Sequence, residues 1–502
     1  MMNILNKSFL FLSILGTLSY AQQIDSVTEK KNTPGINSLH ELRYQLDDYF
    51  SDRNFSDALW GVMVKSLRTG EVLYKRNEDK LFMPASDMKL FTSAASLILL
   101  GSSYSYETNF YVNGDLEKGV IKGDLIIHGS GDPTISNRFY EGNETVLFEN
   151  WADSLKSKGI WVIDGSILGD DSEFDNEGYG KGWSQDYESS WFAAPSSALS
   201  YNDNCIEIKI EPSEINYPAK ITLLPDTKFV TLISKVVTTD DNSQNSISAR
   251  RLRGTNLISV TGNIKKNSMT VVEHISISDP TMYFLTVLKE VFARKGITVK
   301  GRAGGIESAN KNISSDDLTL IYTHKSNSLG LIIKELNKNS NNFYAEQILK
   351  SIGLEEYNFG SVENGVKACK ELYSSMGINP DNLVMADGSG LSRLNLVTPR
   401  QIVNLLSYMY KREEYTKFYE SLPIAGVDGT LIDRMKKTVA ENNVRAKAGY
   451  NTNVSSLSGY LKTISGEPLV FSIMVNNFLA PPALANYIQD NVCNRLINFN
   501  RN

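Results

Sequence analysis

Strand-like segments at both ends of the sequence constrain its fold more than any other feature. Near the N-terminus, apolar runs at 60–66 and 72–74 are joined by Arg68-Thr69-Gly70, a spacing that predicts a β-hairpin. Near the C-terminus, three runs predict antiparallel strands and a fourth predicts a helix, at 444–450, 458–464, 469–476 and 482–497. We expect all these strands to form one sheet, so that the chain between them interrupts a single domain.

The chain between these ends is mostly of another character. From residue 104 to 280, short alternating runs are separated by Gly, Asp and Asn, which is typical of strands and turns. Helical periodicity returns at 280–295, and one continuous helix is expected over 329–349. The sequence therefore predicts an α+β protein. Its principal domain, residues 39–103 and 281–502, is split by a β-rich insert of one or two small domains at 104–280.

The first 21 residues have the pattern of a secretory signal peptide. Lys7 precedes an apolar run at 9–15, and small residues lead to a cleavage site after Ala21. A membrane anchor would need about 20 apolar residues, and this run is too short. Residues 22–38 are polar and are expected to form a flexible leader. Since no later apolar run is long enough to span a bilayer, we expect an exported, periplasmic protein, soluble or peripherally associated with the envelope.

Composition excludes several classes of protein. The 51 Lys and Arg residues against 57 Asp and Glu give a net charge of -6, which argues against a nucleic-acid-binding protein. A hydrophobic content of 41% is enough to build several cores, so disorder is excluded as the main state. Of the three cysteines, Cys205, Cys369 and Cys493, at least one is left unpaired because their number is odd, and their spacing suggests neither a disulfide framework nor a metal site. We expect buried free thiols.

Ser86 and Lys89 are the first candidates for chemistry. They open an apolar helical run that extends to Leu100, and residues three apart on a helix share a face. A serine hydroxyl is a weak nucleophile and needs a base. Lysine can be that base when burial lowers its pKa, because desolvation disfavours the ammonium form. Ser308 and Lys311 repeat the spacing in a Gly- and Asn-rich loop, so position favours Ser86.

Two further motifs are weaker when taken alone. Ser340-Asn341-Asn342 lies inside a helical pattern, where three polar residues are unfavourable unless they cap a helix or line a site. A solvated turn is an equally good interpretation of that triplet. Lys447-Ala448-Gly449 lies on a predicted strand, where a glycine would allow the substrate backbone to approach closely.

Other catalytic arrangements find no support in the sequence. The histidines, His40, His128, His274 and His324, show neither the H-E-x-x-H pattern nor any paired metal-ligand spacing. There is no G-x-S-x-G nucleophile elbow and no Walker or dinucleotide-binding fingerprint. Serine chemistry in this chain must therefore use lysine as its base, or be absent.

Taken in order along the chain, these motifs resemble those of penicillin-binding proteins and serine β-lactamases. More specifically, the chain resembles the D-alanyl-D-alanine carboxypeptidase/endopeptidase family of low-molecular-mass class C penicillin-binding proteins. The resemblance runs across almost the whole chain after the signal peptide. Its specific stretches are 83–89, 129–134, 193–200, 340–346, 387–393, 422–431 and 456–460. The resemblance implies a penicillin-binding/β-lactamase-like transpeptidase domain, and the long insert is itself typical of the family.

The resemblance also implies how the reaction would proceed. Ser86 would attack the D-alanyl carbonyl of a peptidoglycan peptide, and Lys89 would take its proton. Ser340, linked to Lys89 and Lys447, would pass a proton to the departing amine. Water would then hydrolyse the acyl-enzyme, so no cofactor or metal is needed. β-Lactams would be covalent inhibitors.

Other residues would bind the substrate. The resemblance implies that Asn342 hydrogen-bonds the substrate amide and that Lys447 supplies positive potential near the terminal carboxylate. Backbone N–H groups of Ser86 and Tyr450 would stabilise the oxyanion, and loss of one such donor typically costs about 10²–10³ in rate. Gly449 would lie beside the substrate backbone.

The chain departs from the family pattern on the Lys447 strand. Ala448 stands where the family usually has Thr or Ser, whose hydroxyl helps to hold the substrate or β-lactam carboxylate, and Tyr450 replaces a small hydroxyl residue. A lost hydrogen bond to a charged group costs about 1.5–3 kcal/mol, or about 10- to 150-fold. We therefore expect attenuated activity. Thr452 or Arg393 would be candidates to compensate.

Two more side chains are candidates with open alternatives. Arg393 could receive a carboxylate from a peptide cross-link, or it could form a structural ion pair. In the segment 183–192, family members use an acidic residue to contact the diaminopimelate side chain. Asp186 is the candidate for that role, although Tyr187 could occupy the position instead.

Two rival functions remain at the level of sequence. One is a β-lactamase or esterase on the same fold. The other is a pseudoenzyme that binds peptidoglycan with weak turnover, which Ala448 favours and the intact Ser86 and Lys89 disfavour.

Overall fold

The computed structural model describes residues 36–308 and 318–501. The expected signal peptide, residues 1–21, lies outside these ranges, as does the expected leader up to residue 35. Ile36, near the end of that leader, is buried and pairs with Phe499 in an isolated bridge. No helix in the described ranges is both long and apolar enough to cross a membrane.

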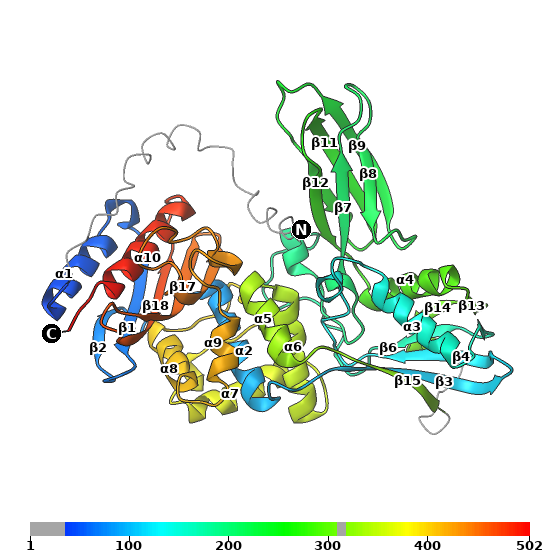
Figure 1. Ribbon diagram of the computed structural model, residues 1–502, viewed down its shortest axis with the longest axis horizontal. Coiled ribbons are helices and arrows are strands. Elements are labelled where there is room, and N and C mark those ends of the chain that lie inside the picture. Colours follow the sequence, from blue (N-terminus) through cyan, green and yellow to red (C-terminus); the bar gives the residue numbers. More distant parts are fainter. Residues whose placement is uncertain (1–35, 309–317, 502) are drawn as a thin grey trace.

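One five-stranded antiparallel sheet joins the two ends of the chain, as predicted (Figure 1). The strand order is β16-β17-β18-β1-β2. The strands are β1 (Leu59–Ser66), β2 (Val72–Arg76), β16 (Arg445–Asn451), β17 (Val454–Lys462) and β18 (Pro468–Asn476). Eight of the nine residues of β17 are buried, because helices cover both faces of this sheet.

The two faces of the sheet carry different helices. One core contains α1 (Leu39–Phe50) and α10 (Pro482–Ile497), together with sheet residues such as Val62 and Leu457. The other core contains the remaining helices of the domain and sheet residues such as Met63 and Tyr460. Those helices are α2 (Met88–Leu99), α5 (Leu329–Asn339), α6 (Asn342–Tyr357), α7 (Val362–Ser375), α8 (Pro399–Met409) and α9 (Tyr415–Ser421).

The insert between α2 and α5 contains a seven-stranded sheet. Its main path is β13-β5-β4-β3-β15, with β6 paired to both β4 and β14. The strands are β3 (Glu107–Glu117), β4 (Val120–His128), β5 (Val162–Ile163), β6 (Ile167–Asp170), β13 (Thr298–Val299), β14 (Ala303–Gly305) and β15 (Leu318–Lys325). Helices α3 (Val146–Ser157) and α4 (Pro280–Arg294) pack on it around Trp151 and Phe284.

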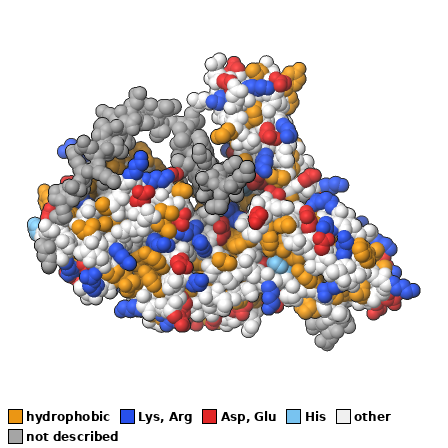
Figure 2. Space-filling model, viewed as in Figure 1, with side chains coloured by type: hydrophobic (Ala, Val, Ile, Leu, Met, Phe, Trp, Pro, Cys, Tyr) orange, Lys and Arg blue, Asp and Glu red, His pale blue; other side chains and the backbone are white. Residues whose placement is uncertain are grey.

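Two three-stranded sheets project from this body (Figure 1). Their orders are β10-β11-β9 and β12-β7-β8. The strands are β7 (Cys205–Glu211), β8 (Lys220–Leu224), β9 (Thr231–Thr239), β10 (Ser248–Arg251), β11 (Leu257–Lys265) and β12 (Val271–Ser276). On the face seen in Figure 2, acidic and basic side chains are interspersed over both the projecting sheets and the rest of the molecule.

The insert extends beyond the boundary expected at residue 280, because α4 and β13–β15 pack with it. These elements lie C-terminal to that boundary, yet α4 belongs to the core of the insert and β15 pairs with β3 along Leu318–Lys325. No strand was predicted between residues 296 and 328, so the pairing of β15 with β3 was not anticipated. We therefore propose that the principal domain resumes after Lys325.

The three cysteines are buried free thiols, as expected.

Candidate active site

Ser86 lies in a tight turn directly ahead of α2. The turn, η3 (Ala85–Asp87), is a 3₁₀ segment held by the neighbouring sheet. The Ser456 hydroxyl on β17 donates to the Pro84 carbonyl at 2.7 Å. A Cβ atom at Gly449 on β16 would lie 2.7 Å from the Ser86 nitrogen, so only glycine lets this strand approach the turn so closely. The close approach at Gly449 is therefore to Ser86 itself, and its contact with substrate stays a prediction.

Lys89 lies three residues after Ser86, in the first turn of α2, and is fully buried. Its ammonium donates to Ser86 Oγ at 3.1 Å, to Asn342 Oδ1 at 2.6 Å and to the Ser389 carbonyl at 2.6 Å. Burial and the positive charge of Lys447 lower the pKa of Lys89 well below its usual value. The geometry thus joins a serine hydroxyl to a lysine that readily exists as a neutral base.

The Ser340-Asn341-Asn342 triplet interrupts the helix that was expected to be continuous over 329–349, and that expectation was wrong. Ser340 ends α5 with a left-handed backbone (φ 54°), and Asn341 caps α6 by accepting from the Tyr344 N–H at 3.3 Å. A non-glycine residue with this backbone is uncommon and costs free energy. Apolar periodicity continues through the break, so periodicity alone could not reveal it.

Lys447 contacts this break from the sheet side. It is fully buried on β16, and its ammonium donates to Ser340 Oγ at 2.9 Å and to the Ala448 carbonyl at 2.7 Å. Burial lowers the pKa of Lys447 to about 8. The structure therefore links Ser340 to Lys447, whereas the three acceptors of Lys89 are Ser86, Asn342 and Ser389.

Two buried carboxylates complete this region, and sequence reasoning assigned neither a role. Glu346 accepts from the N–H groups of Gly388 (3.1 Å) and Ser389 (2.9 Å), and it thereby fixes the carbonyl that receives Lys89. Burial and the charge of Asp387 raise the pKa of Glu346 to about 7. Both carboxylates lie in stretches that carry the family resemblance, but spacing alone does not bring them to Lys89.

The insert reaches the site through the segment 183–192. Trp183 Nε1 donates to Asp387 Oδ2 at 2.8 Å, and Asn342 Nδ2 donates to the Phe192 carbonyl at 2.7 Å. Asp186 lies on this segment and is exposed to solvent, but no hydrogen bond joins its carboxylate to the described site residues. Its contact with a substrate side chain remains a prediction.

Arg393, Tyr450 and Thr452 lie at the rim of the site. Arg393 Nη1 donates to the Thr452 carbonyl at 2.7 Å, and no carboxylate oxygen of the described ranges lies within 4.0 Å of its guanidinium. Tyr450 is 57% exposed. Ala448 lies on the same strand and packs partly into the core around α1 and α10. Among the described residues, Arg393 therefore forms a hydrogen bond to the backbone and no ion pair.

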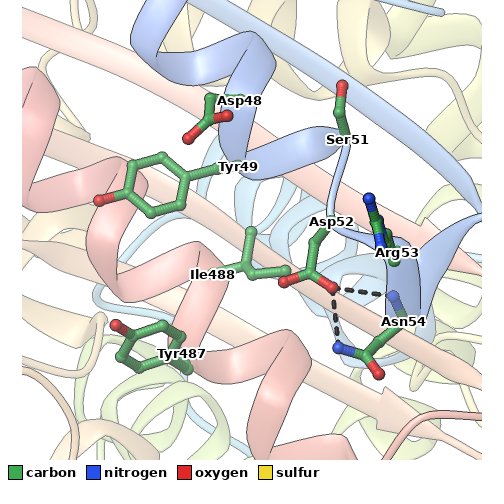
Figure 3. A pocket seen from close by; sticks show the side chains of 8 residues that line it. All are labelled: Asp48, Tyr49, Ser51, Asp52, Arg53, Asn54, Tyr487 and Ile488. Carbon is green, nitrogen blue, oxygen red and sulfur yellow. Dashed lines mark hydrogen bonds between the residues drawn. The ribbon is translucent and has the colours of Figure 1, made fainter.

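A separate cavity of about 490 Å³ lies between α1 and α10, on the face of the five-stranded sheet opposite to α2 (Figure 3). It is lined by Asp48, Tyr49, Ser51, Asp52, Arg53, Asn54, Tyr487 and Ile488. Asp52 caps the adjacent turn by accepting from Asn54, so this part of the lining serves the local structure. No residue with a predicted catalytic role lines this cavity.

The arrangement around Ser86 can activate a hydroxyl and stabilise negative charge. A neutral Lys89 can remove the proton of Ser86. The ammonium group of Lys447 can attract an anion. Within the described ranges no cluster of three or more His, Cys, Asp or Glu side chains could hold a metal ion.

Comparisons with known proteins agree with this arrangement. The model of the D-Ala-D-Ala carboxypeptidase 3 (S13) family matches residues 42–496. A D-alanyl-D-alanine carboxypeptidase of Actinomadura sp. is 33% identical over 475 residues, 92% of this chain and 85% of the relative. D-alanyl-D-alanine carboxypeptidase DacB of Haemophilus influenzae is 26% identical over 430 residues, 83% of this chain and 85% of the relative.

A solved structure shows the same architecture. Penicillin binding protein 4 (dacB) from Haemophilus influenzae matches with a TM-score of 0.78 and 24% sequence identity, over 90% of this chain and 99% of that chain. The predicted α+β penicillin-binding-protein fold is therefore confirmed.

Proposed function

Since the chain belongs to the D-Ala-D-Ala carboxypeptidase 3 (S13) family, we propose that it hydrolyses D-alanyl-D-alanine ends of peptidoglycan peptides through an acyl-enzyme at Ser86. The observation that carries this proposal is the 3.1 Å hydrogen bond between Lys89 Nζ and Ser86 Oγ, made by a fully buried lysine. A buried ammonium loses its proton easily, so Lys89 can act as the general base that a serine nucleophile requires.

In the first step, Ser86 Oγ attacks the D-alanyl carbonyl as its proton passes to Lys89. The oxyanion forms near the N–H groups of Ser86 and Tyr450, and the charge of Lys447 favours it. The carbon–nitrogen bond to the terminal D-alanine then breaks. Ser340, which accepts from Lys447 at 2.9 Å, passes a proton to the departing amine. Asn342, held by Lys89, hydrogen-bonds the substrate amide.

In the second step, water attacks the acyl-enzyme. By then Ser340 has recovered a proton from Lys447, and the proton that Lys89 took from Ser86 has replaced the one lost there, so Lys89 is neutral again. Lys89 now takes a proton from the water and gives it to Ser86 Oγ as the ester bond breaks. The product is a peptide shortened by one D-alanine. The same chemistry would cut a peptide cross-link whose leaving amine belongs to a neighbouring strand, and Arg393 at the rim is the candidate to receive a carboxylate of such a substrate.

We further propose that β-lactams acylate Ser86. A structure of the Haemophilus influenzae relative is described as complexed with a novel β-lactam, which supports the proposal by likeness. Because Ala448 lacks a hydroxyl for the β-lactam carboxylate, we expect slow acylation rather than none. The expected signal peptide supports export to the periplasm, where peptidoglycan is accessible.

The second candidate function is a peptidoglycan-binding protein with weak turnover. The specific observation in its favour is Ala448, together with the exposed Tyr450 beside it. A β-lactamase or esterase on the same fold would instead hydrolyse nitrocefin faster than a D-Ala-D-Ala peptide.

The deciding experiment is the intact mass of the mature protein after incubation with benzylpenicillin, followed by peptide mapping. An adduct on Ser86 supports the proposal, and an adduct on any other residue contradicts it. D-alanine release from a D-Ala-D-Ala peptide is measured in parallel, with Ser86→Ala as the control. Absence of both adduct and release in a folded sample would favour the binding protein.

A further inference from the structure

Asp87 is a buried carboxylate next to the nucleophile that the mechanism above does not use. It follows Ser86 in η3 and is completely buried. Neither of its carboxylate oxygens has a hydrogen-bond partner within the described ranges. Buried carboxylates are almost always hydrogen-bonded or paired, because an unpaired charge in the interior is costly. Some group in this region must therefore offset the cost of Asp87.

The register of the sheet identifies the surroundings of Asp87. On β16 and β17, Gly449 lies opposite Ser456 and Lys447 lies opposite Ser458. Side chains directly opposite each other in an antiparallel pair share one face of the sheet. The η3 turn rests on that face, since Gly449 approaches the Ser86 nitrogen and Ser456 bonds to the turn. Asp87 is therefore held over the serines beside Lys447.

Both serine hydroxyls already have acceptors. Ser456 Oγ donates to the Pro84 carbonyl at 2.7 Å, and Ser458 Oγ donates to Ser472 Oγ at 2.9 Å. Each hydroxyl can turn towards Asp87 only by leaving its present acceptor. Both hydroxyls lie close enough to Asp87 to lower its pKa, but their hydrogen bonds in the structure go to Pro84 and Ser472.

Lys447 lacks a direct carboxylate partner. Its ammonium donates to Ser340 Oγ and to the Ala448 carbonyl, which are both neutral, and no described carboxylate lies within 4.0 Å of it. Burial lowers the pKa of Lys447 to about 8, and Asp87 is the charged group that opposes this shift. Burial raises the pKa of Asp87 to about 7, an effect that Ser458, Lys447, Ser456 and Lys89 oppose.

We propose that Asp87 is a positioning residue that serves as the through-space counter-ion of Lys447. Ionised Asp87 keeps Lys447 positively charged. The positive charge of Lys447 in turn favours neutral Lys89, and this effect is larger than the opposing effect of the Asp87 charge on Lys89, so that Lys89 can accept the proton of Ser86. Asp87 touches no reacting atom in this scheme and acts only through the two lysines.

The charged groups around this pair come from several elements. Lys89 on α2 faces Asp87 and Lys447, and it also faces Glu346 on α6 and Asp387 in the loop after η10 (Pro380–Asn382). Glu346 accepts two hydrogen bonds and Asp387 accepts four, whereas no hydrogen bond to Asp87 is present among the described residues. Asp87 is thus the carboxylate whose charge is least compensated by its own hydrogen bonds and most available to Lys447.

The first test measures acylation by nitrocefin or benzylpenicillin from pH 5.5 to 9.5 for the wild type and Asp87→Asn. The substitution keeps the side-chain shape and removes the charge. We expect the alkaline limb, which reports loss of charge from Lys447, to move to lower pH by about one unit or more in the variant. An alkaline limb at the wild-type position would overturn the proposal.

The second test is independent of activity, and it rests only on folding. Thermal or urea unfolding at pH 7.5 is compared for the wild type, Asp87→Asn, Lys447→Met and the double variant. A counter-ion predicts that Lys447→Met destabilises the wild type more than it destabilises the Asp87→Asn protein. Additive effects would refute the pairing even if the proposed peptidase activity were present. Coupling without acylation would keep the pairing and reject the proposed function.

Discussion

The side chains assigned to chemistry and those at the rim are held in different ways. The inner site, Ser86, Lys89, Ser340, Asn342 and Lys447, is largely buried, and its members bond to one another. The rim, Arg393, Tyr450 and Thr452, lies at the surface, and Arg393 bonds to a backbone carbonyl. Such a division fixes the reacting groups while the rim can vary with the substrate. Substitutions in the two regions should therefore differ in size and in kind.

Removal of the nucleophile should give the largest effect. Ser86→Ala should abolish β-lactam adducts and lower D-alanine release by at least about 10⁴-fold, because no other group can form the acyl-enzyme. Ser308→Ala, at the other Ser-x-x-Lys spacing, is the matched control and should keep full activity. Mass spectrometry and D-alanine release are the measurements. Full adduct formation by Ser86→Ala would show that Ser86 is not the nucleophile.

Loss of the second lysine should be the next largest effect. Lys447→Met removes the donor to Ser340 and the positive charge that we expect near the substrate carboxylate, so the acylation rate should fall by about 10²–10³. Lys462→Met, on the exposed end of β17, should leave the rate unchanged. Stopped-flow acylation kinetics provide the measurement. Equal acylation rates for the two variants would show that the buried Lys447 is no more important to the reaction than the exposed Lys462.

Restoring the missing hydroxyl should increase activity. Ala448→Thr should speed acylation by about 10- to 150-fold, the value of a hydrogen bond to a charged group, through the carboxylate of the β-lactam. Ala448→Val has nearly the same shape without the hydroxyl and should give no gain. A similar rate for the Thr and Val variants would show that the carboxylate is bound elsewhere, and the rim would then be the place to search.

The pH profile of the wild type should reflect the inner site and the buried carboxylates around it, not the rim. Since the pKa of Lys447 is about 8 and its charged form is needed, acylation should fall about tenfold per pH unit above that value. On the acid side, Asp87 and Glu346 take up protons near pH 7, so the rate should also decline below it. A flat profile between pH 6 and 9 would mean that none of these groups controls the reaction.

Rim substitutions should have the smallest effects. Arg393→Ala should lower cleavage of a cross-linked peptide about 2- to 10-fold, as expected for one solvent-exposed hydrogen bond, and should leave β-lactam acylation nearly unchanged. Arg393→Lys keeps the charge and should retain most of the cleavage. Chromatography of digested cross-linked muropeptides measures the effect. A loss of acylation in Arg393→Ala would move this residue into the inner site.

How well the sequence predicts a feature of this structure depends on how far apart in the sequence the interacting residues lie. The pairing of Ser86 with Lys89 follows from helix geometry over three residues, and the strands of the sheet that joins both ends follow from short apolar runs bounded by turn residues. The break between α5 and α6 was not anticipated, because apolar spacing continues through Ser340. The expected end of the insert at residue 280 also differed, because strand pairing with β3 recruits β15.

The sequence by itself determined the family, the α+β class and the identity of the candidate nucleophile, since these depend on short motifs in a fixed order. The resemblance anticipated the link between Ser340 and Lys447, but only the tertiary structure showed that Lys89 bonds to Asn342 and to the Ser389 carbonyl rather than to Ser340. Asn342 lies 253 residues from Lys89, and Ser340 lies 107 residues from Lys447. The burial of Asp87 without a hydrogen-bond partner was decided at the same level. Charges and pKa values depend on desolvation and on long-range neighbours, which only the folded chain brings together.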